Sequence, residues 1–383
     1  MNFFKHFKSC IFLLTILYFG SSFIVIRHDS EDQKYLDYGK NGGFESLAVF
    51  QHGNGTLIHP NWIITAEHVT VGVYEGSMVT INNQKYEVEK VFIYPQESNN
   101  DVYKKKDIAL VKLKESVTEV SPVKFSTKNP KEGTKIHIAG SGRTGNGLSK
   151  RLESDGKIRG ATNVIDNVSE LFITFDFDRP NDKNVTELEG VSGLGDSGGP
   201  AYIKVNKELI LVGVCSFSFH EQIPEGNYGT IDYYVNVASF TDWIETILRG
   251  KEFFEMEYNG AILTAIIQYN SVETLKVNDE NASIKQKEEL SNMILNKYKS
   301  YLENLSSAEK KLETFLNFVN QIAVAENITQ ELENVAFVLS GNKLLINGKE
   351  TSSKSHKETL TLYESFYGEK LIGDSNIAYN PEG

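Results

Sequence analysis

From about residue 40 to residue 237, the chain consists of short runs rich in valine, isoleucine, tyrosine and phenylalanine. Glycine, asparagine, aspartate or proline separates these runs, which include TLIHPNWIIT, YEVEKVFIY, IALVKL and LILVGVCSF. Such runs and separators are typical of β-strands joined by turns. Because a long helical repeat is missing from this stretch, the sequence predicts an all-β domain of sandwich or barrel type.

A helix is expected to close this domain. In SFTDWIETIL, residues 239–248, the apolar side chains fall on one helical face, Ser239 is placed as an N-cap, and Gly250 follows the last turn. Beyond residue 250 the pattern changes. GAILTAIIQY, within 253–276, indicates one or two strands before a helical region begins.

The rest of the chain is expected to be rich in helices. Apolar residues at helical spacing predict a helix over 284–305, and Ser306 with Glu309 forms a capping-box pattern that would open a second helix to about 325. After these two helices we expect three smaller elements, namely a short helix to about 335, a β-hairpin turning at Gly341-Asn342, and a helix from about Ser355 to Tyr367. Residues 251–383 therefore form a predicted extension, a helical hairpin followed by a small β-hairpin/helix unit.

The N-terminus, MNFFKHFKSC IFLLTILYFG SSF, has the three parts of a secretory signal. Lys5 and Lys8 precede an apolar run, and Gly20 and Ser22 are small residues suited to cleavage. We expect a signal peptide over 1–22 and a protein secreted to the periplasm or the extracellular space. The alternative is a retained membrane anchor, but Gly-Ser-Ser interrupts the apolar run, which is shorter than the roughly 20 residues that a spanning helix needs.

Charge and cysteine content exclude some classes of protein. The formal charge of −12 argues against a nucleic-acid partner, because nucleic-acid-binding proteins usually present a basic face. Removal of residues 1–22 would remove Cys10 and leave Cys215 alone, so the mature chain would form no intramolecular disulfide. No metal-ligand spacing is present, and neither a metal nor a cofactor is expected.

Residues 191–201, VSGLGDSGGPA, place Ser197 among four glycines. Glycine adopts backbone angles closed to other residues and lets other groups approach the main chain. A nucleophilic serine needs both properties, because its Oγ must project from a sharp bend while nearby N–H groups point at the developing oxyanion. A surface turn is the other interpretation of the glycines, so the rest of the chain must supply a base and an acid.

Two upstream segments provide those partners. His68 follows the apolar run WIIT in TAEHV, and Asp107 heads the run IALVKL. A lone histidine or aspartate at the end of a strand is usually structural. The order histidine, aspartate, serine along one β-rich domain indicates a nucleophilic hydrolase instead.

Together, TAEH, DIALVKL, GDSGGP and the closing DWI helix resemble the chymotrypsin/trypsin family of serine endopeptidases over residues 24–249. The resemblance implies two perpendicular six-stranded β-barrels within a protease domain over 23–250, and a polypeptide substrate bound in the cleft between the barrels. It further implies Ser197 as nucleophile, His68 as general base and acid, and Asp107 as the residue that orients the imidazole. The N–H groups of Gly195 and Ser197 would form the oxyanion hole.

The same resemblance assigns Asp196 to pair with a newly formed N-terminus. Cleavage near Ser22 would expose the apolar segment around Ile24 and Val25, so removal of the signal would itself create the activating terminus. A pairing of Asp196 with a side chain such as Arg27 is the alternative.

The resemblance also gives a substrate pocket. Val191 stands at its floor and favours a small or apolar side chain before the scissile bond, while Ser216, Phe217 and Ser218 form the adjoining strand. Asp232 lies near a second pocket position, where an acid would restore a preference for basic residues.

The sequence departs from the family at its disulfides. Gly53 and Val69 occupy the two positions of the disulfide beside the catalytic histidine. Stability must therefore come from elsewhere, and the C-terminal extension is one candidate source.

Two other functions stay open at this point. A catalytically silent relative would act as a binding or sensor protein through its cleft. Alternatively, the C-terminal extension would have the primary role, as a sensor or adaptor that binds a protein partner and controls the protease.

Overall fold

The computed structural model describes residues 24–95, 102–149, 155–219, 226–269, 271–329, 335–367, 370–371 and 376–379. The expected signal peptide, residues 1–22, lies outside the described residues.

The first half of the protease region forms a closed barrel of antiparallel strands in the order β2-β3-β4-β7-β6-β5. These strands are β2 (Leu47–Phe50), β3 (Gly53–His59), β4 (Trp62–Thr65), β5 (Met78–Ile81), β6 (Gln84–Ile93) and β7 (Ala109–Leu113). Fully buried side chains such as Leu57, Ile63 and Leu110 fill the barrel. The β-rich runs of the sequence thus supply alternating side chains that point into this core.

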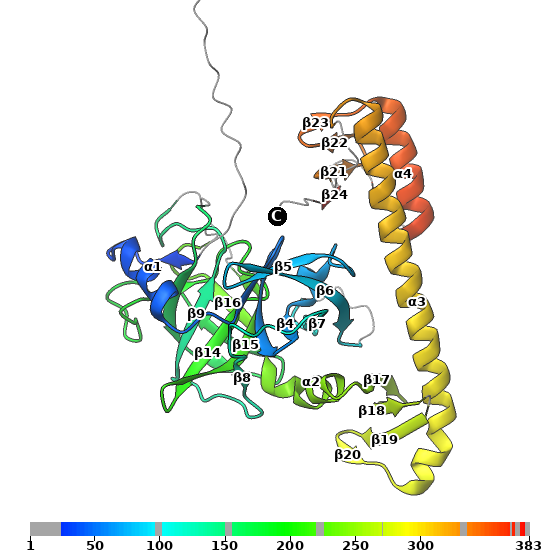
Figure 1. The fold of residues 1–383 in the computed structure, drawn as a ribbon, viewed down its shortest axis with the longest axis horizontal. Coiled ribbons are helices and arrows are strands. Elements are labelled where there is room, and N and C mark those ends of the chain that lie inside the picture. Colours follow the sequence, from blue (N-terminus) through cyan, green and yellow to red (C-terminus); the bar gives the residue numbers. More distant parts are fainter. Residues whose placement is uncertain are drawn as a thin grey trace, which may run out of the picture.

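The second half forms another barrel-like sheet, in the order β10-β9-β14-β15-β16-β12-β11, with β8 pairing to β15. Its strands are β8 (Lys124–Phe125), β9 (Lys135–Gly140), β10 (Arg159–Val164), β11 (Asn167–Val168), β12 (Phe172–Asp176), β14 (Pro200–Val205), β15 (Glu208–Phe219) and β16 (Ile231–Asn236). A separate two-stranded sheet joins β1 (Val25–Ile26) to β13 (Gly190–Val191). The mainly β fold with two barrel-like sheets of trypsin type is therefore confirmed (Figure 1).

The closing helix differs slightly from its prediction. A 3₁₀ turn, η2 (Val237–Phe240), leads into α2 (Thr241–Leu248), and Gly250 follows with a positive φ of 72°. Ser239 is not the N-cap, because its hydroxyl donates to the carbonyl of Glu170.

One helix was not expected from the sequence. Helix α1 (Asp32–Asn41) is mostly polar, and only Tyr35 and Gly39 of it are buried, so it carries no apolar stripe that pattern analysis can detect. The buried guanidinium of Arg159 in β10 bonds to both carboxylate oxygens of Asp32, at 2.5 and 2.7 Å, and so ties this helix to the second barrel.

The C-terminal region begins with an antiparallel sheet rather than one or two strands. It contains β17 (Glu252–Tyr258), β18 (Ala261–Gln268), β19 (Ser271–Val277) and β20 (Glu280–Asn281). Helix α3 (Ile284–Ala325) follows as one continuous helix, so the break predicted at Ser306 is wrong. The capping box lies at the start of α3 instead, between Ser283 and Gln286.

A second small sheet lies at the far end of α3, in the order β23-β22-β21-β24. Its strands are β21 (Phe337–Ser340), β22 (Leu344–Ile346), β23 (Lys349–Glu350) and β24 (Asn376–Tyr379). The predicted hairpin at Gly341-Asn342 is the β21–β22 connection. The short helix predicted to about residue 335 falls largely on residues outside the described ones.

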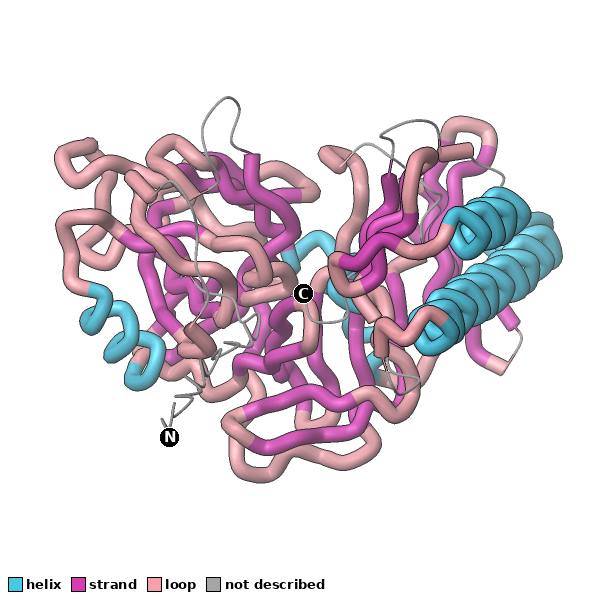
Figure 2. Tube along the Cα trace, turned by 90° about the horizontal axis from the view of Figure 1, so that it is seen from above, coloured by secondary structure: helices cyan, strands magenta, loops and turns pink. Residues whose placement is uncertain are grey.

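Helix α4 (Ser353–Tyr367) packs beside the second half of α3, so α4, and not a segment after Ser306, is the helical partner of α3. Figure 1 shows α3 running from the first small sheet to the second, and Figure 2 shows the two long helices side by side on one flank. Within the described ranges, no helix is long and apolar enough to cross a bilayer.

Candidate active site

His68 and Asp107 lie at the ends of neighbouring strands of the first barrel. Strand β4 leads into the 3₁₀ turn η1 (Glu67–Thr70), and Asp107 stands just before β7, which pairs with β4. One carboxylate oxygen of Asp107 accepts a 3.0 Å hydrogen bond from the His68 backbone N–H, and the other lies 2.7 Å from Nδ1 of the imidazole. This double contact fixes both the backbone and the ring of His68.

Ser216 adds a third hydrogen bond to the same carboxylate. Its hydroxyl donates to Oδ2 of Asp107 at 2.6 Å. Burial raises the pKa of Asp107, but the hydrogen bonds from His68 and Ser216 outweigh it and hold the pKa below its ordinary value of 3.8. Asp107 is therefore an anion at neutral pH, and Nδ1 of His68 must donate its proton to that anion. Sequence analysis assigned Ser216 only to the substrate pocket.

The Ser197 segment packs against the strands that carry His68. The carbonyl of Ser197 accepts a 2.7 Å hydrogen bond from the Asn54 N–H in β3. The N–H of Gly198 donates at 2.7 Å to the carbonyl of Cys215, next to Ser216. A Cβ on Gly198 would overlap with the Asn54 carbonyl and the Thr65 hydroxyl. The glycines thus allow the loop to approach the first barrel closely.

Two backbone N–H groups of this loop, those of Gly195 and Ser197, differ from their neighbours in their hydrogen bonding. The N–H groups of Asp196, Gly198 and Gly199 donate to nearby carbonyls, whereas no backbone carbonyl in the described part of the chain accepts from Gly195 or Ser197. Gly195 has a φ of +94°, which glycine adopts readily. This geometry supports the expected role of Gly195 and Ser197.

Asn54 fixes the orientation of the Gly195 peptide. Its amide donates to the carbonyl of Gly195 at 2.9 Å, while its own oxygen accepts from Ser141 at 2.7 Å. Asn54 is fully buried, and sequence analysis had given it no role. No local pattern identifies such a residue, because its partners lie far away in the sequence.

Asp196 is buried under the loop that follows β9. Its carboxylate accepts hydrogen bonds from the N–H groups of Gly142 and Gly193, the latter at 2.8 Å. Burial raises the pKa of Asp196 to about 8, against the effect of these hydrogen bonds. Gly140 and Gly142 are needed here, because a Cβ on either would overlap with the carboxylate.

The N-terminal segment reaches the same region. Ile24 is fully buried, and its carbonyl accepts a 2.8 Å hydrogen bond from the hydroxyl of Thr144. Arg27, the alternative partner of Asp196, instead pairs with Asp29 at 2.7 Å. The residue that Ile24 contacts, Thr144, therefore lies two positions after Gly142, which bonds to Asp196.

The expected pocket residues have different surroundings. Val191 is fully buried in the core of the second barrel and pairs with Val25 of β1. Asp232 is also fully buried, and its carboxylate accepts from the Ser192 N–H at 2.7 Å and from the Ser218 hydroxyl at 2.6 Å. The polar centre of this region is thus Asp232 and not Val191.

Phe217, the middle residue of the expected pocket strand, belongs to an aromatic cluster. Its ring stacks on Tyr233 with centroids 4.5 Å apart, and Phe172 and Tyr103 contact both rings edge-on. The strand that holds Ser216 next to Asp107 is therefore supported by a rigid apolar surface.

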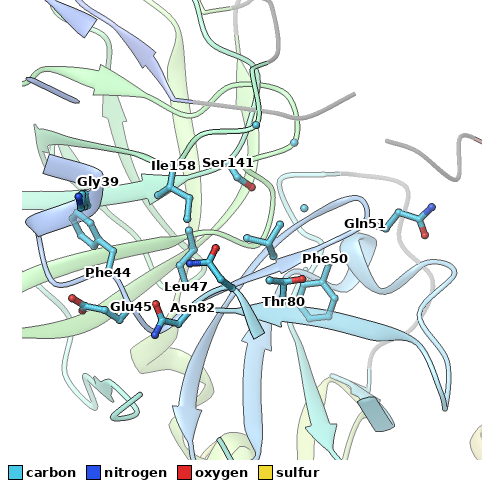
Figure 3. A pocket seen from close by; sticks show the side chains of 16 residues that line it. Gly39, Phe44, Glu45, Leu47, Phe50, Gln51, Thr80, Asn82, Ser141 and Ile158 are labelled. Atoms are coloured by element: carbon cyan, nitrogen blue, oxygen red, sulfur yellow. The ribbon is translucent and has the colours of Figure 1, made fainter. Parts of the chain in front are cut away.

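A cleft of about 620 Å³ opens on the other side of the Ser197 loop. Gly195 lines it, together with Ser141 and with the apolar side chains of Phe44, Leu47 and Ile158, which Figure 3 labels. Asn82, Gln51 and Glu45 add polar groups at its rim (Figure 3).

Gly53 and Val69, the two positions expected to replace a disulfide of the family, lie side by side. A Cβ on Gly53 would lie 2.7 Å from a methyl carbon of Val69, so these two residues are direct neighbours. Cys215 is free and buried. Among the described residues, no group of three histidine, cysteine, aspartate or glutamate side chains is arranged to hold a metal ion.

Comparison with known proteins decides the family. The family model described as Trypsin matches residues 40–244, which is more than half of the chain. The chain belongs to the trypsin family. It is a serine-type endopeptidase, as sequence analysis expected.

Relatives of this trypsin-family chain cover the protease region. Snake venom serine protease 3 of Protobothrops jerdonii is 26% identical over 213 residues, which span 51% of this chain and 78% of that protein. Chymotrypsin-like elastase family member 1 of Macaca fascicularis is 29% identical over 217 residues, again 51% and 78% of the two chains. The solved structure of neuropsin from mouse brain covers 54% of this chain and 95% of its own, with 20% identity and a TM-score of 0.42.

Proposed function

We propose that this protein is an exported endopeptidase that cleaves polypeptides through His68, Asp107 and Ser197 and an acyl-enzyme intermediate. The double contact between Asp107 and His68 carries the proposal, since it holds the imidazole as an oriented base beside the Ser197 loop. Export rests on the N-terminal sequence, residues 1–22.

The proposed chemistry follows from these positions. Because Asp107 accepts from Nδ1 of His68, Nε2 is left to take the proton of Ser197 as its Oγ attacks the scissile carbonyl carbon. The N–H groups of Gly195 and Ser197 then stabilise the oxyanion, and one such donor contributes about 3–4 kcal/mol to lowering the barrier. His68 returns the proton to the leaving amine. In the second half of the reaction, water gives a proton to His68 and attacks the acyl-enzyme carbonyl carbon. The bond to the Ser197 Oγ breaks, His68 returns the proton to that oxygen, and the carboxylic acid product is released.

Asp196 is proposed to pair with the amino group formed when the leader is removed. Burial raises the pKa of Asp196 although backbone N–H groups donate to its carboxylate, and an ammonium group beside it would lower that pKa. The contact of Ile24 with Thr144 supports an N-terminus in this region. N-terminal sequencing of active protein tests this, since a first residue far downstream, such as Asp37, would exclude it.

The cleft beside Gly195 is proposed to hold the substrate segment that follows the scissile bond. Its apolar walls and polar rim suit an extended peptide, which has both backbone amides and side chains to place. The strand of Ser216 to Ser218 would hold the segment before the bond. A protein partner for the C-terminal extension stays a separate proposal, and membrane attachment would require the N-terminal segment to be retained.

A catalytically silent binding protein is the competing function. The test is labelling with a fluorophosphonate that reacts with activated serines, together with hydrolysis of a peptide library. We expect the wild type to be labelled and to cleave peptides, and Ser197→Ala and His68→Ala to lose activity by roughly 10⁴-fold or more. An unlabelled, inactive wild type that binds peptides through the same cleft would favour the silent relative.

A further inference from the structure

Glu255, in the first strand of the C-terminal region, contacts the segment that carries Asp107. Its carboxylate forms an ion pair with the ammonium group of Lys106. The other carboxylate oxygen accepts a 2.7 Å hydrogen bond from the hydroxyl of Tyr94. Only 17% of the Glu255 side chain is exposed, so water screens these contacts less than it screens a surface ion pair.

Lys106 and Tyr94 lie on the two chain segments that meet at Asp107. Lys106 directly precedes Asp107, and Tyr94 directly follows β6, the strand that pairs with β7. The N–H of Tyr94 donates at 3.3 Å to the carbonyl of Ile108, on the other side of Asp107. The Lys106 ammonium also lies 5.0 Å from the centre of the Tyr94 ring. Glu255 therefore joins both segments at one point.

This contact is anchored in the core of the protease region. The Tyr94 ring, 5% exposed, packs against Phe240, Trp243 and Phe253 at centroid distances of 5.0 to 5.5 Å. Phe253 belongs to β17 and is itself buried in the first-barrel cluster. Burial and the nearby Glu255 carboxylate raise the pKa of Tyr94 far above its ordinary value, so the hydroxyl keeps the proton that it donates.

A second ion pair holds the same segment from the side of the histidine. Lys105 lies 3.3 Å from the carboxylate of Glu67, and Glu67 directly precedes His68. Consecutive lysines before Asp107 thus bond in different directions, Lys105 to the His68 turn and Lys106 to the C-terminal sheet. The two ion pairs thus connect the segment just before Asp107 to the His68 turn and to the C-terminal sheet.

We propose that Glu255 is a positioning residue for catalysis, which acts through Lys106 and Tyr94 to hold Asp107 against His68. The first sheet of the C-terminal region is then part of the catalytic unit and not an appended module. The inference rests on the proposed function of Asp107. A displacement of about 1 Å in an active site can lower the rate by up to 10²-fold. Loss of the contacts of Glu255 with Lys106 and Tyr94 should therefore have a measurable effect on kcat.

The test uses the full chain with single and double substitutions. Glu255→Gln removes the charge with little change in shape, and Lys106→Met removes its partner. Lys276→Gln is the matched control, because Lys276 pairs with Asp242 and so joins the same sheet to α2 without contacting the Asp107 segment. Glu257→Gln is a second control, an exposed residue on the same face of β17.

Steady-state kinetics on a peptide substrate, normalised by active-site titration, gives kcat and KM for each variant. We expect kcat to fall about tenfold in Glu255→Gln and in Lys106→Met with KM changed less than about twofold, because Asp107 touches no substrate. The double variant should be no slower than the slower single variant, since each substitution alone already breaks the ion pair between Glu255 and Lys106. Both controls should keep the wild-type kcat.

The downfield proton resonance of His68 Nδ1–H provides a readout that does not need turnover. It should shift in Glu255→Gln and not in Lys276→Gln. An unchanged kcat and resonance in Glu255→Gln, or an equal loss in Lys276→Gln, would overturn the inference. A wild type as inactive as Ser197→Ala would instead overturn the proposed function.

Discussion

The hydroxyl of Ser216 donates a 2.6 Å hydrogen bond to Oδ2 of Asp107, the carboxylate oxygen that also lies 2.7 Å from Nδ1 of His68. The second barrel supplies Ser216 and the first supplies the other two residues. The contact therefore joins the barrels at the carboxylate of Asp107.

Ser216→Ala should lower kcat by about tenfold, which corresponds to about 1.4 kcal/mol and to the loss of one hydrogen bond to a charged group. Asp107 has a lowered pKa, so its contribution to stability is present above its ordinary pKa and is lost as pH falls through the folded value. With one hydrogen bond removed, the folded pKa of Asp107 rises toward its ordinary value, so that loss should be smaller and should be complete at a higher pH. Denaturant titrations between pH 3 and 7 check this, and an unchanged kcat would show that Ser216 does not support Asp107.

Gly198→Ala should abolish most activity and destabilise the fold. Gly198 has a φ of +75°, and its Cβ position is occupied by the Asn54 carbonyl and the Thr65 hydroxyl. The left-handed backbone alone costs about 1–2 kcal/mol for alanine, and the overlap adds to that. Gly250→Ala is the control, since its φ is +72° but nothing lies within 4 Å of its Cβ position. Urea unfolding of the two variants should show the larger loss for Gly198, and similar losses would contradict the packing argument.

Asp196→Asn should make the stability of the unprocessed chain less dependent on pH. The folded carboxyl has a pKa of about 8 and the unfolded one about 3.8, so the folded state binds the extra proton and wild-type stability falls as pH rises from about 4 to about 8. Burial raises the pKa of Glu189 to about 7, so Glu189 also makes stability fall as pH rises. Both proteins contain Glu189, so its effect cancels when their pH profiles are compared.

Unfolding of both proteins, with the residues before Ile24 retained, is measured across this pH range. Parallel pH profiles for Asp196→Asn and wild type would show that Asp196 does not titrate in the folded chain. After removal of the leader, wild-type stability near pH 7 should increase and that of Asp196→Asn should not.

Asp232→Asn should change the preference for the residue before the scissile bond. A buried carboxylate beside Ser192 and Ser218 favours a lysine or arginine side chain there. Cleavage profiling with a proteome-derived peptide library should show a basic preference in wild type that Asp232→Asn weakens. A wild-type preference for small apolar residues would favour Val191 as the determinant instead.

Val49→Arg should separate the two halves of the substrate site. Val49 lines the cleft beside Gly195, so a large charged side chain there should slow cleavage of peptides with several residues after the scissile bond, by about tenfold or more in kcat/KM. Hydrolysis of a p-nitroanilide, which has no such residues, should stay within about twofold. Val205→Arg, an exposed substitution on β14, is the control. Equal effects on both substrates would exclude the cleft as a site for the leaving segment.

The elements that the sequence predicted well are those with a strong local pattern. Alternating apolar residues and turn residues identify the strands around His68 and Asp107, and the glycines around Ser197 mark a loop that must approach another backbone. The break predicted at Ser306 was wrong for a related reason. Sequence alone does not distinguish a capping-box pattern inside a helix from one at the start of a helix. Helix α3 runs through Ser306 without a break.

Other features depended on partners far away in the sequence. Helix α1 has no apolar stripe and is held by Arg159, more than 100 residues away in sequence. Asn54 and Ser216 act through hydrogen bonds to distant residues, and Glu255 reaches Lys106 across 149 positions. Such contacts leave no periodic trace in the sequence.

The sequence by itself therefore determined the β-rich character of the protease region and the order of His68, Asp107 and Ser197 along it, because side-chain type and spacing are local properties. The tertiary structure alone decided that the buried Asp232 carboxylate bonds to Ser192 and Ser218 while Val191 lies in the apolar core, and that the C-terminal sheet touches the segment of Asp107. Both follow from how distant strands pair and pack, since burial and charge neighbours exist only once the chain has folded.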